Sequence, residues 1–463
     1  FVNRGEATAK TLGNADAVVL EINSKSGLYP LYVTYSIFMA KCAAYTAEKL
    51  DAELQEKLWD ETVRDNVFVV CKTPMAKAIT KRTLVGFRDA AVNMHYFNDL
   101  VNMLKNKPEA FRKKVLRKSY WNKNGGGKMK FDAVVGNPPY QLTDGSGGTN
   151  DAPIYQHFVE AAQKLTSRYA SLIIPSRWFT TGRENLLGDF RANMLSNPGI
   201  KTMFAFTNSK DVFPTVEIKG GLCYYLYDTA YSGDCLFTLV QNGERNATKR
   251  RLDDFDILIR EPQLAEIVKK VMDQTGQYED MVSSLISSDT PFGIPTNPKS
   301  SKKNPIKVFP IEGKWHNTKL FYIENTKRKI GYVDKACVTK NTELIDDIKV
   351  FIPKAYGAGE TFPHQILGIP EYAGGNSVCS QSYLFATFEN EAFAKNFILY
   401  LKTKFFRALV LAAKISQDAP SRAYRFVPLQ DFSKPWTDAE LYEKYGLTDE
   451  EISFIEETIK PME

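Results

Sequence analysis

The chain has 463 residues, of which 43% are hydrophobic and 25% charged, a composition typical of a soluble globular protein with two or three domains. No apolar run reaches the roughly 20 residues of a membrane-spanning helix, which argues against a transmembrane protein. No signal peptide is visible either. Because the chain begins with Phe1 and not with methionine, we expect a tag, a cleaved segment or a whole domain before it.

Cysteine and histidine usage argues against metal sites and disulfides. The six cysteines are scattered without a Cys-x-x-Cys pair, and the four histidines are isolated, without metal-ligand spacing. We therefore expect reduced thiols, a cytoplasmic protein and no bound metal. None of the cysteines follows a proline, so the Pro-Cys nucleophile of cytosine-C5 methylation is absent.

The net charge of +6 is unevenly distributed. Residues 101–130 carry ten Lys or Arg and one acid, and residues 299–330 carry nine Lys or Arg and two acids. Clustered positive charge is typical of a phosphate-bearing partner, although either cluster alone could be a solvated helix face. We expect both segments to contact the phosphates of a nucleic acid.

Short β-prone segments alternate with helical ones at the start of the chain. The predicted strands are 17–22, 66–71 and 91–96. The predicted helices are 28–45, 47–60, one that starts at Thr73-Pro74, and a basic helix at 103–120. Turn-forming residues at 23–27 (Asn-Ser-Lys-Ser-Gly) separate the first strand from its helix.

Asn137-Pro138-Pro139-Tyr140 is the most informative stretch of the chain. It follows an apolar run, Phe131–Gly136, that predicts a buried strand. The prolines then form a rigid turn at the carboxyl end of a sheet, where open α/β sheets bind ligands. Each proline lacks a backbone N–H, which leaves carbonyl groups to accept hydrogen bonds from something else. An amide side chain, a carbonyl and an aromatic ring can together hold the amino group of a planar base.

The alternation of strands and helices continues to about residue 230. We expect helices at 155–165 and 184–195, strands at 169–174 and 201–206, and a hairpin at 211–227. Strands that alternate with helices predict an α/β fold, with a Rossmann-like, mostly parallel sheet and helices on both of its faces. Antiparallel pairing is expected only at the hairpin.

The pattern changes in the second half of the chain. The predicted pieces are a linker or exposed loop at 290–310, short strands within 305–385, and a long helix at 389–415 whose aromatic stripe belongs to a core. Two capping boxes, Thr437 with Glu440 and Thr448 with Glu451, predict two short C-terminal helices. We therefore expect an α+β arrangement in this half.

Taken in this order, the segments resemble the γ-type adenine-N6 DNA methyltransferases, and most closely the methylase part of fused restriction-modification enzymes. Residues 1–230 carry the resemblance by motif and would form an S-adenosylmethionine-dependent methyltransferase domain. Residues 231–463 resemble a DNA target-recognition region by position, size and charge. The resemblance implies site-specific methyl transfer to the N6 amine of a flipped adenine in double-stranded DNA, in a restriction-modification system.

The catalytic residues that the resemblance implies are Asn137, Pro138 and Tyr140. In the family, the asparagine side chain and the first proline carbonyl accept the hydrogens of the target amine, and the aromatic ring stacks on the extruded base. Phe213, in the stretch Phe-Pro-Thr-Val, matches the segment that packs on the flipped base. No metal and no covalent intermediate are required for this transfer.

The cofactor residues match the family in part. Relatives read roughly Leu-Asp-Pro-x-x-Gly-Ser-Gly where this chain has Leu20 to Gly27. The matching residues, implied to bind S-adenosylmethionine, are Glu21, Ser26 and Gly27, with Asp99 as the acid that accepts from the cofactor adenine. Ile22 replaces a proline, Lys25 replaces a glycine, and Cys71 stands where an acid usually holds the ribose hydroxyls.

Other functions stay open. The changes at Lys25 and Cys71 fit a catalytically weak DNA-binding or specificity component. A glutamine amide presents an NH2 group like that of adenine, so protein-glutamine or RNA adenine methylation also fits the motif. Asp211 with Glu217 and Lys219 superficially resembles a metal-dependent nuclease motif, but exposed charges on a hairpin explain it more simply. No Gly-x4-Gly-Lys-Ser/Thr loop is present, so a nuclease or helicase would lie upstream or on another subunit.

Overall fold

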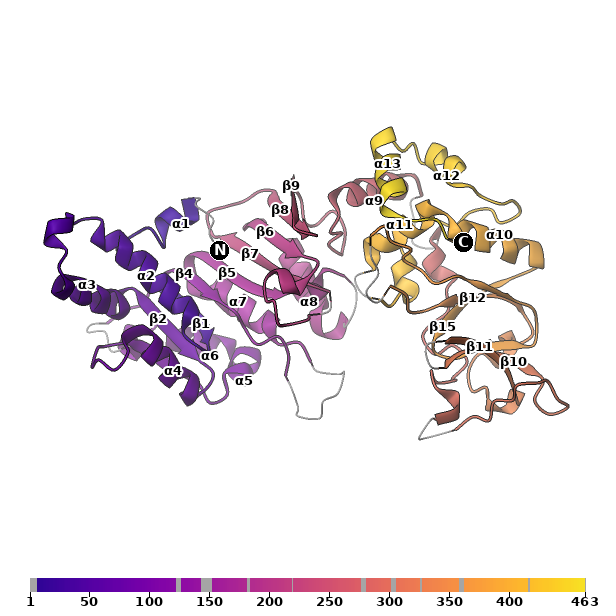
Figure 1. The fold of residues 1–463 in the computed structure, drawn as a ribbon, viewed down its shortest axis with the longest axis horizontal. Helices are drawn as coiled ribbons and strands as arrows, with labels where there is room; N and C mark the ends of the chain where they lie inside the picture. The colour runs from indigo at the N-terminus through magenta and orange to yellow at the C-terminus, as the bar shows by residue number, and fades with distance from the viewer. Residues whose placement is uncertain are drawn as a thin grey trace. The chain divides into compact units, whose positions relative to one another are not determined.

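A computed structural model describes residues 6–121, 126–142, 152–180, 184–218, 220–275, 280–300, 305–324, 327–357, 362–414 and 417–462. The chain forms two units, Phe1–Asp256 and Ile257–Glu463, whose helices and strands are labelled in Figure 1. Among the described residues, no helix combines the length and the apolar character that crossing a lipid bilayer requires.

The described residues of the first unit form one nine-stranded sheet, in the order β3-β2-β1-β4-β5-β7-β6-β8-β9 (Figure 1). Its strands are β1 (Val19–Ser24), β2 (Val67–Cys71), β3 (Asn93–Tyr96), β4 (Phe131–Gly136), β5 (Thr166–Pro175), β6 (Ile200–Phe206), β7 (Leu222–Asp228), β8 (Cys235–Gln241) and β9 (Glu244–Arg250). Strands β1 to β5 run parallel to one another, and β7 runs antiparallel to β5 and β6. The prediction of a mostly parallel, Rossmann-like sheet is confirmed.

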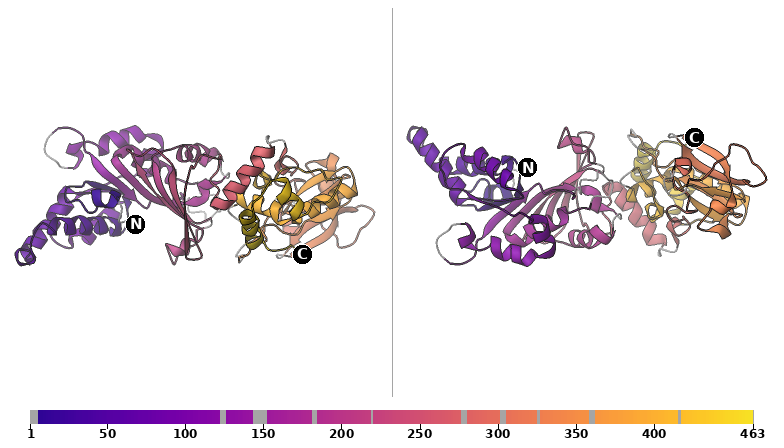
Figure 2. Two further views of the ribbon diagram at one scale, coloured as in Figure 1. Left: turned by 90° about the horizontal axis from the view of Figure 1, so that it is seen from above. Right: turned by 90° about the horizontal axis from the view of Figure 1, so that it is seen from below.

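Helices lie on both sides of this sheet (Figure 2). They are α1 (Glu6–Lys10), α2 (Leu28–Cys42), α3 (Ala52–Asp65), α4 (Pro74–Val85), α5 (Leu100–Asn106), α6 (Pro108–Val115), α7 (Tyr155–Leu165) and α8 (Glu184–Leu195). Neighbouring residues of β2 point to opposite faces. Val67 and Val69 share a core with α2 and α3, whereas the ring of Phe68 packs 5.2 Å from that of Trp121. Burial on both faces explains why these strands are apolar throughout.

The antiparallel part of the first unit differs from the expectation. The hairpin predicted at 211–227 is wrong, because β7 pairs with β6 and β5, and residues 211–218 form no strand. A second antiparallel pair joins β8 and β9. Since β8 also pairs with β6, the first unit continues to Asp256, past the boundary expected at residue 230.

The second unit contains two three-stranded sheets, with the orders β11-β10-β14 and β13-β12-β15. Their strands are β10 (Thr318–Glu324), β11 (Lys327–Val333), β12 (Ile348–Pro353), β13 (Glu371–Ala373), β14 (Ser377–Cys379) and β15 (Tyr383–Phe388). The rings of Phe321 in β10 and Phe351 in β12 lie 4.8 Å apart and belong to one cluster of buried residues. The two sheets therefore share one hydrophobic core.

Helices complete the second unit. They are α9 (Pro262–Thr275), α10 (Glu391–Lys402), α11 (Lys404–Ala413), α12 (Asp438–Lys444) and α13 (Asp449–Thr458). Both predicted capping boxes are present, at Thr437 and at Thr448, and the two C-terminal helices are confirmed. The long helix predicted at 389–415 is divided at Thr403 into α10 and α11. The α+β character expected of this half is confirmed.

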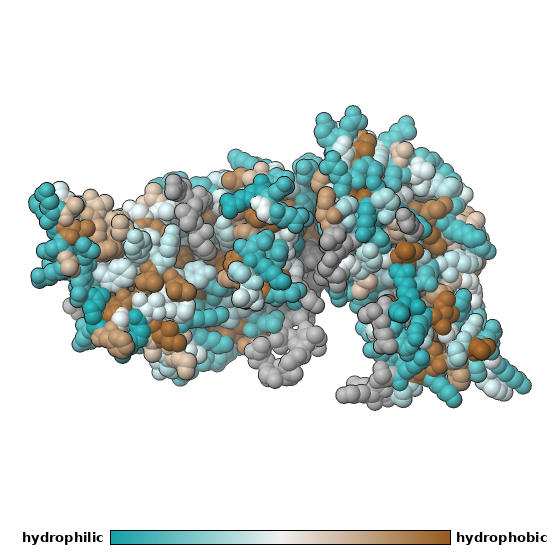
Figure 3. Space-filling view, viewed as in Figure 1, coloured by the Kyte–Doolittle hydropathy of each residue, from teal (hydrophilic) through white to brown (hydrophobic). Residues whose placement is uncertain are grey.

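Hydrophobic residues also occur on the surface, interspersed with hydrophilic ones on the face drawn in Figure 3. On α2 the exposed apolar residues are Leu28, Tyr32, Tyr35 and Met39, at helical spacing. The opposite side of α2 is apolar too and packs on the sheet through Val33 and Ile37. This helix therefore has apolar side chains on both its buried and its exposed face.

Candidate active site

Asn137–Tyr140, which we call the proline corner, follow β4 at the place where the strand order of the sheet reverses. From β1 the chain proceeds to β2 and β3 on one side, and it returns to β4 on the other side. Ligands of open α/β sheets bind at such a point, beyond the carboxyl ends of the strands. A Cβ atom on Gly136 would lie 2.5 Å from the carbonyl oxygen of Ile22, so a glycine is required where the two strand ends approach.

Asn137 is held through both its backbone and its side chain. Asn23, which is buried at the end of β1, donates a hydrogen bond from Nδ2 to the backbone carbonyl of Asn137 at 3.0 Å. The φ angle of Asn23 is 76°, in the left-handed region that asparagine tolerates better than most residues. A second hydrogen bond joins the side chain of Asn137 to Tyr29, near the start of α2.

The bond between Tyr29 and Asn137 is one of three influences on the pKa of the phenol. Burial raises the pKa of Tyr29 and the nearby Glu21 carboxyl adds to the rise, whereas the bond with Asn137 lowers the pKa. The raised pKa keeps Tyr29 a neutral phenol, whose hydroxyl can donate to or accept from the Asn137 amide. The bond ties the side chain of Asn137 to the start of α2.

Tyr140 lies beside the same cluster with a half-buried ring. Burial raises its pKa far above the ordinary value for tyrosine, and Tyr29 and Cys223 of β7 add to the rise. Its hydroxyl oxygen is buried and has no hydrogen-bond partner among the residues that the structure describes. The side chain is therefore a neutral phenol, and its aromatic ring is the main surface with which it can contact a ligand.

The loop after β1 packs closely against α4. Ser24 Oγ lies 3.1 Å from Thr80 Oγ1, and Thr83 Oγ1 donates to the backbone carbonyl of Ser26 at 2.7 Å. Gly27 has a φ of 81°, and a Cβ atom there would lie 2.8 Å from Thr83 Cβ. A larger residue would therefore be strained and would push the loop away from α4.

Glu21 is buried in β1, just before this loop. Burial raises its pKa to about 8, opposed by a hydrogen bond from Ser24. Its Oε2 atom is buried and accepts no hydrogen bond from the part of the chain that the structure describes. Buried polar atoms are normally paired, so this oxygen is suited to receive a donor from a ligand.

Three other residues of interest lie at the same edge of the sheet, at or after the ends of other strands. Asp99 is exposed and follows β3, Phe213 is half-buried in the loop after β6, and Cys71 ends β2. Burial raises the pKa of the Cys71 thiol to about 12, so it supplies no negative charge in the place of the missing acid. The structure thus gathers Glu21 and the proline corner into one cluster, with Asp99 and Phe213 further out along the edge.

Sequence reasoning missed Asn23 and Tyr29. Asn23 lies within residues 20–27, which the resemblance implies to be the cofactor loop, and Tyr29 lies just after them. The bond from Asn23 to Asn137 spans 114 positions, so local spacing gives no sign of it. An asparagine at the end of a buried strand was the available signal, since such a residue often adopts a left-handed conformation and bonds backbone groups.

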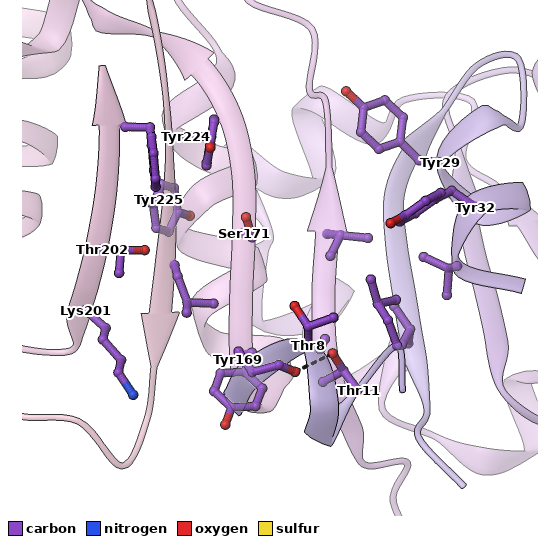
Figure 4. Close-up of a pocket in the computed structure, with 18 of the residues that line it drawn as sticks. Thr8, Thr11, Tyr29, Tyr32, Tyr169, Ser171, Lys201, Thr202, Tyr224 and Tyr225 are labelled. Carbon is purple, nitrogen blue, oxygen red and sulfur yellow. Dashed lines mark hydrogen bonds between the residues drawn. The ribbon is translucent and has the colours of Figure 1, made fainter. Parts of the chain in front are cut away.

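A hollow of about 980 Å³ lies over the sheet face beside α2 (Figure 4). Tyr29 and Tyr32 from α2 line one side of it, and Tyr224 and Tyr225 from β7 line the other. Its described lining includes Tyr29 but not Asn137. The hollow therefore adjoins the proline corner through one shared side chain, and it is separate from the site predicted from the sequence.

Much of the basic segment 101–130 lies far from the proline corner. Lys130 immediately precedes β4, and Lys128 forms a backbone bridge with Arg117. These residues lie at the amino end of the strand whose carboxyl end carries Asn137, about 20 Å away by the length of a six-residue strand. Any phosphate contact that they make would be distant from the reacting base.

Residues 65–213 match the family model described as Eco57I restriction-modification methylase. The range runs from the end of α3 to Phe213 and contains the proline corner, whereas Glu21, Ser26 and Gly27 precede it. It covers about a third of the chain. The resemblance predicted from the motifs is confirmed over this range.

Over 116 residues the chain is 43% identical to a Mycoplasma pneumoniae protein described as an uncharacterized adenine-specific methylase. The match covers 25% of this chain and 27% of that protein, so the chain spans about a quarter of the length of this relative.

Two solved structures are similar over most of the chain. The Type IIL restriction-modification enzyme MmeI in complex with DNA has a TM-score of 0.54 at 10% identity, covering 99% of this chain and 69% of that one. A nuclease-deletion mutant of the Type ISP restriction-modification enzyme LlaGI, in complex with a DNA substrate mimic, has a TM-score of 0.49 at 8% identity, covering 90% and 44%. The likeness to MmeI supports the fold described above.

Proposed function

We propose that the protein is a DNA adenine-N6 methyltransferase of a restriction-modification system that uses S-adenosylmethionine. The observation that carries the proposal is the proline corner at the reversal point of the sheet, where Asn23 and Tyr29 hold Asn137 by its backbone and its side chain. The match of residues 65–213 to a restriction-modification methylase family supports it.

The chemistry follows from the acceptors at the corner. The N6 amine of adenine is a poor nucleophile, because its lone pair is delocalised into the ring. The side-chain oxygen of Asn137 and the backbone carbonyl of Pro138 would accept its two hydrogens and favour a tetrahedral nitrogen whose lone pair points outward. The ring of Tyr140 would stack on the unstacked base and offset about 1–3 kcal/mol of the cost of extruding it.

Tyr29 has a supporting role in this mechanism. This role requires the Tyr29 hydroxyl to accept from the amide N–H of Asn137, which would keep the side-chain oxygen turned toward the amine. Without that bond the Asn137 amide could rotate and point its own NH2 group at the amino group of the adenine. Tyr29 is therefore a positioning residue, and Asn137 is the residue that touches the substrate.

The residues after β1 fit the cofactor in part. S-adenosylmethionine supplies a methyl group on a positively charged sulfur, and its amino group is a second cation. The buried Oε2 of Glu21 would accept from that amino group, Ser26 and Gly27 would line the loop, and Asp99 would accept from the adenine. The end of β2 fits less well, since Cys71 is neutral there, and Lys25 is an exposed cation in the loop.

The proposal is tested by incubating the protein with duplex DNA of mixed sequence and cofactor labelled on the methyl group. We expect label in DNA and N6-methyladenine after hydrolysis to nucleosides. Parallel reactions with RNA and with a protein acceptor test the two alternative substrates, adenine in RNA and the glutamine side chain. Label only in RNA or only in glutamine side chains would contradict DNA methylation.

A DNA-binding component with weak or no catalysis is the second candidate, favoured by the neutral Cys71 at the end of β2. Calorimetry with S-adenosylmethionine distinguishes it from the first. Binding in the micromolar range supports the enzyme, whereas DNA binding without cofactor binding supports the specificity component.

A further inference from the structure

The second unit carries a short loop, residues 309–316, whose base is fixed to the sheet. Phe309 and Tyr332 of β11 exchange two backbone hydrogen bonds, at 2.9 and 2.8 Å. The ring of His316 stacks on that of Phe309 with centroids 3.6 Å apart and closes the base of the loop. Gly313 and His316 exchange two further backbone bonds, each at 3.2 Å. Backbone hydrogen bonds therefore connect the loop to β11 at its base and close its turn.

The tip of this loop presents two large apolar side chains to solvent. Trp315 and Ile311 are each 75% exposed. Leaving an indole in water forgoes the free energy of burying one of the largest apolar side chains. Trp436 of the same unit contrasts with it, because that ring is half-buried and its Nε1 donates to the carbonyl of Asp431 at 2.9 Å.

Lysines flank the loop in the sequence, and one of them lies beside Trp315. Between residues 305 and 319 the chain has three lysines, Lys307, Lys314 and Lys319, and one acid, Glu312. The ammonium of Lys314 lies 5.1 Å from the centre of the Trp315 ring. Within the described part of the chain, these three lysines form no ion pair with a carboxylate. An exposed aromatic ring beside an unpaired cation suits a partner that offers both flat apolar surface and negative charge.

We propose that loop 309–316 binds duplex DNA, with Trp315 as its apolar anchor. Trp315 and Ile311 would pack against or between bases, as apolar side chains do when they wedge a base step. Lys314 and Lys307 would neutralise flanking phosphates. The inference rests on the proposed function and adds a contact made by the second unit.

Charge complementarity favours DNA over a protein partner. The core of a protein–protein interface is depleted of lysine, whereas phosphate contacts come largely from lysine and arginine. The loop combines two kinds of group that DNA-binding surfaces use together, apolar side chains that contact bases and cations that contact phosphates. If the loop served a protein partner instead, loss of Trp315 would leave duplex affinity unchanged, which the experiment below measures.

The experiment measures duplex affinity by fluorescence anisotropy, with a mixed-sequence DNA and the full chain. We expect Trp315→Ala to weaken binding about tenfold, within the range for the loss of one stacked aromatic, and Trp315→Phe to recover part of it. We expect Lys314→Ala to reduce the slope of log affinity against log salt by about one. Because Trp315 is exposed, its variants should melt at the temperature of the unmodified protein.

The matched control is Phe87→Ala in the first unit, which removes a ring that is 90% exposed and lies 4.1 Å from the Arg82 guanidinium. This variant should bind DNA as the unmodified protein does. Equal affinity of Trp315→Ala and unmodified protein, with methyl transfer to DNA intact, would overturn the inference and leave the proposed function standing. If the unmodified protein neither binds duplex DNA nor methylates it, the proposed function fails as well.

Discussion

Glu21 is a buried carboxyl group whose protonation is coupled to folding. Its pKa is raised from 4.5 to about 8, and burial is the main cause. Between these two values the folded chain binds a proton that the unfolded chain releases, so stability falls as pH rises through this window. At neutral pH the group is therefore mostly the neutral acid, unless a cation beside it favours the carboxylate.

Replacement of Glu21 by glutamine should remove this pH dependence. We expect Glu21→Gln to be more stable than the unmodified protein at pH 8.5 and similar to it at pH 4.5, because glutamine keeps the shape without the proton. Each unit of pKa difference corresponds to about 1.4 kcal/mol. Urea unfolding at several pH values measures the free energy of unfolding of both proteins. A constant difference between them from pH 4.5 to pH 8.5 would contradict the raised pKa of Glu21.

Tyr29 tests the role of a single hydrogen bond at the proline corner. We expect Tyr29→Phe to lower kcat about tenfold, the effect of one lost hydrogen bond, while KM for DNA changes little. Tyr32→Phe is the control, because Tyr32 lies on the same helix and lines the same hollow. An unchanged kcat in Tyr29→Phe would mean that the tyrosine does not position Asn137.

At the scale of elements, local signals predicted local structure well. The sequence located α7 and α8 at their observed bounds, and it located the two C-terminal helices by capping boxes that form within one turn. The basic helix predicted at 103–120 is in fact two helices, since Pro108 begins α6 and cannot continue α5.

The division at Thr403 could not be predicted in this way. The aromatic spacing continues across it, and part of the cap of α11 comes from Asp438, more than thirty residues later. The two carboxylate oxygens of Asp438 accept from the backbone N–H groups of Lys404 and Phe405, at 3.1 and 2.8 Å. A tertiary contact of this kind does not change the spacing of hydrophobic residues, so the sequence pattern does not reveal it.

This cap should contribute measurably to stability. We expect Asp438→Ala to destabilise the second unit by about 1–2 kcal/mol, because two N–H groups at the start of α11 lose their acceptor. Asp449→Ala, at an exposed position in the first turn of α13, is the comparison and should cost less. Equal effects of the two variants on thermal unfolding would argue that the Asp438 contact is unimportant.

At the scale of the molecule, the sequence predicted the two kinds of architecture but not where they divide. The alternating pattern of strands and helices changes near residue 230, whereas β8 and β9 complete the first sheet through pairing that this pattern does not reveal. The candidate site shows the same limit. The motif identified the proline corner, but its supports, Asn23 and Tyr29, became visible only when β1 and β4 were seen side by side.

Several whole-molecule expectations stay predictions. They are the target-recognition role of the second unit, the cytoplasmic location, and any nuclease or helicase that acts with the protein. The central claim is narrower, namely that the proline corner grips the amino group of an extruded adenine.

The most direct measurement of that claim compares Asn137→Ala with the unmodified protein, using N6-methyladenine formation and duplex affinity side by side. We expect methyladenine to fall on the order of 100-fold or more, the loss that follows removal of one preorganised polar contact in an active site, while duplex affinity stays within a factor of about three. Methylation at the unmodified rate in Asn137→Ala would contradict the account.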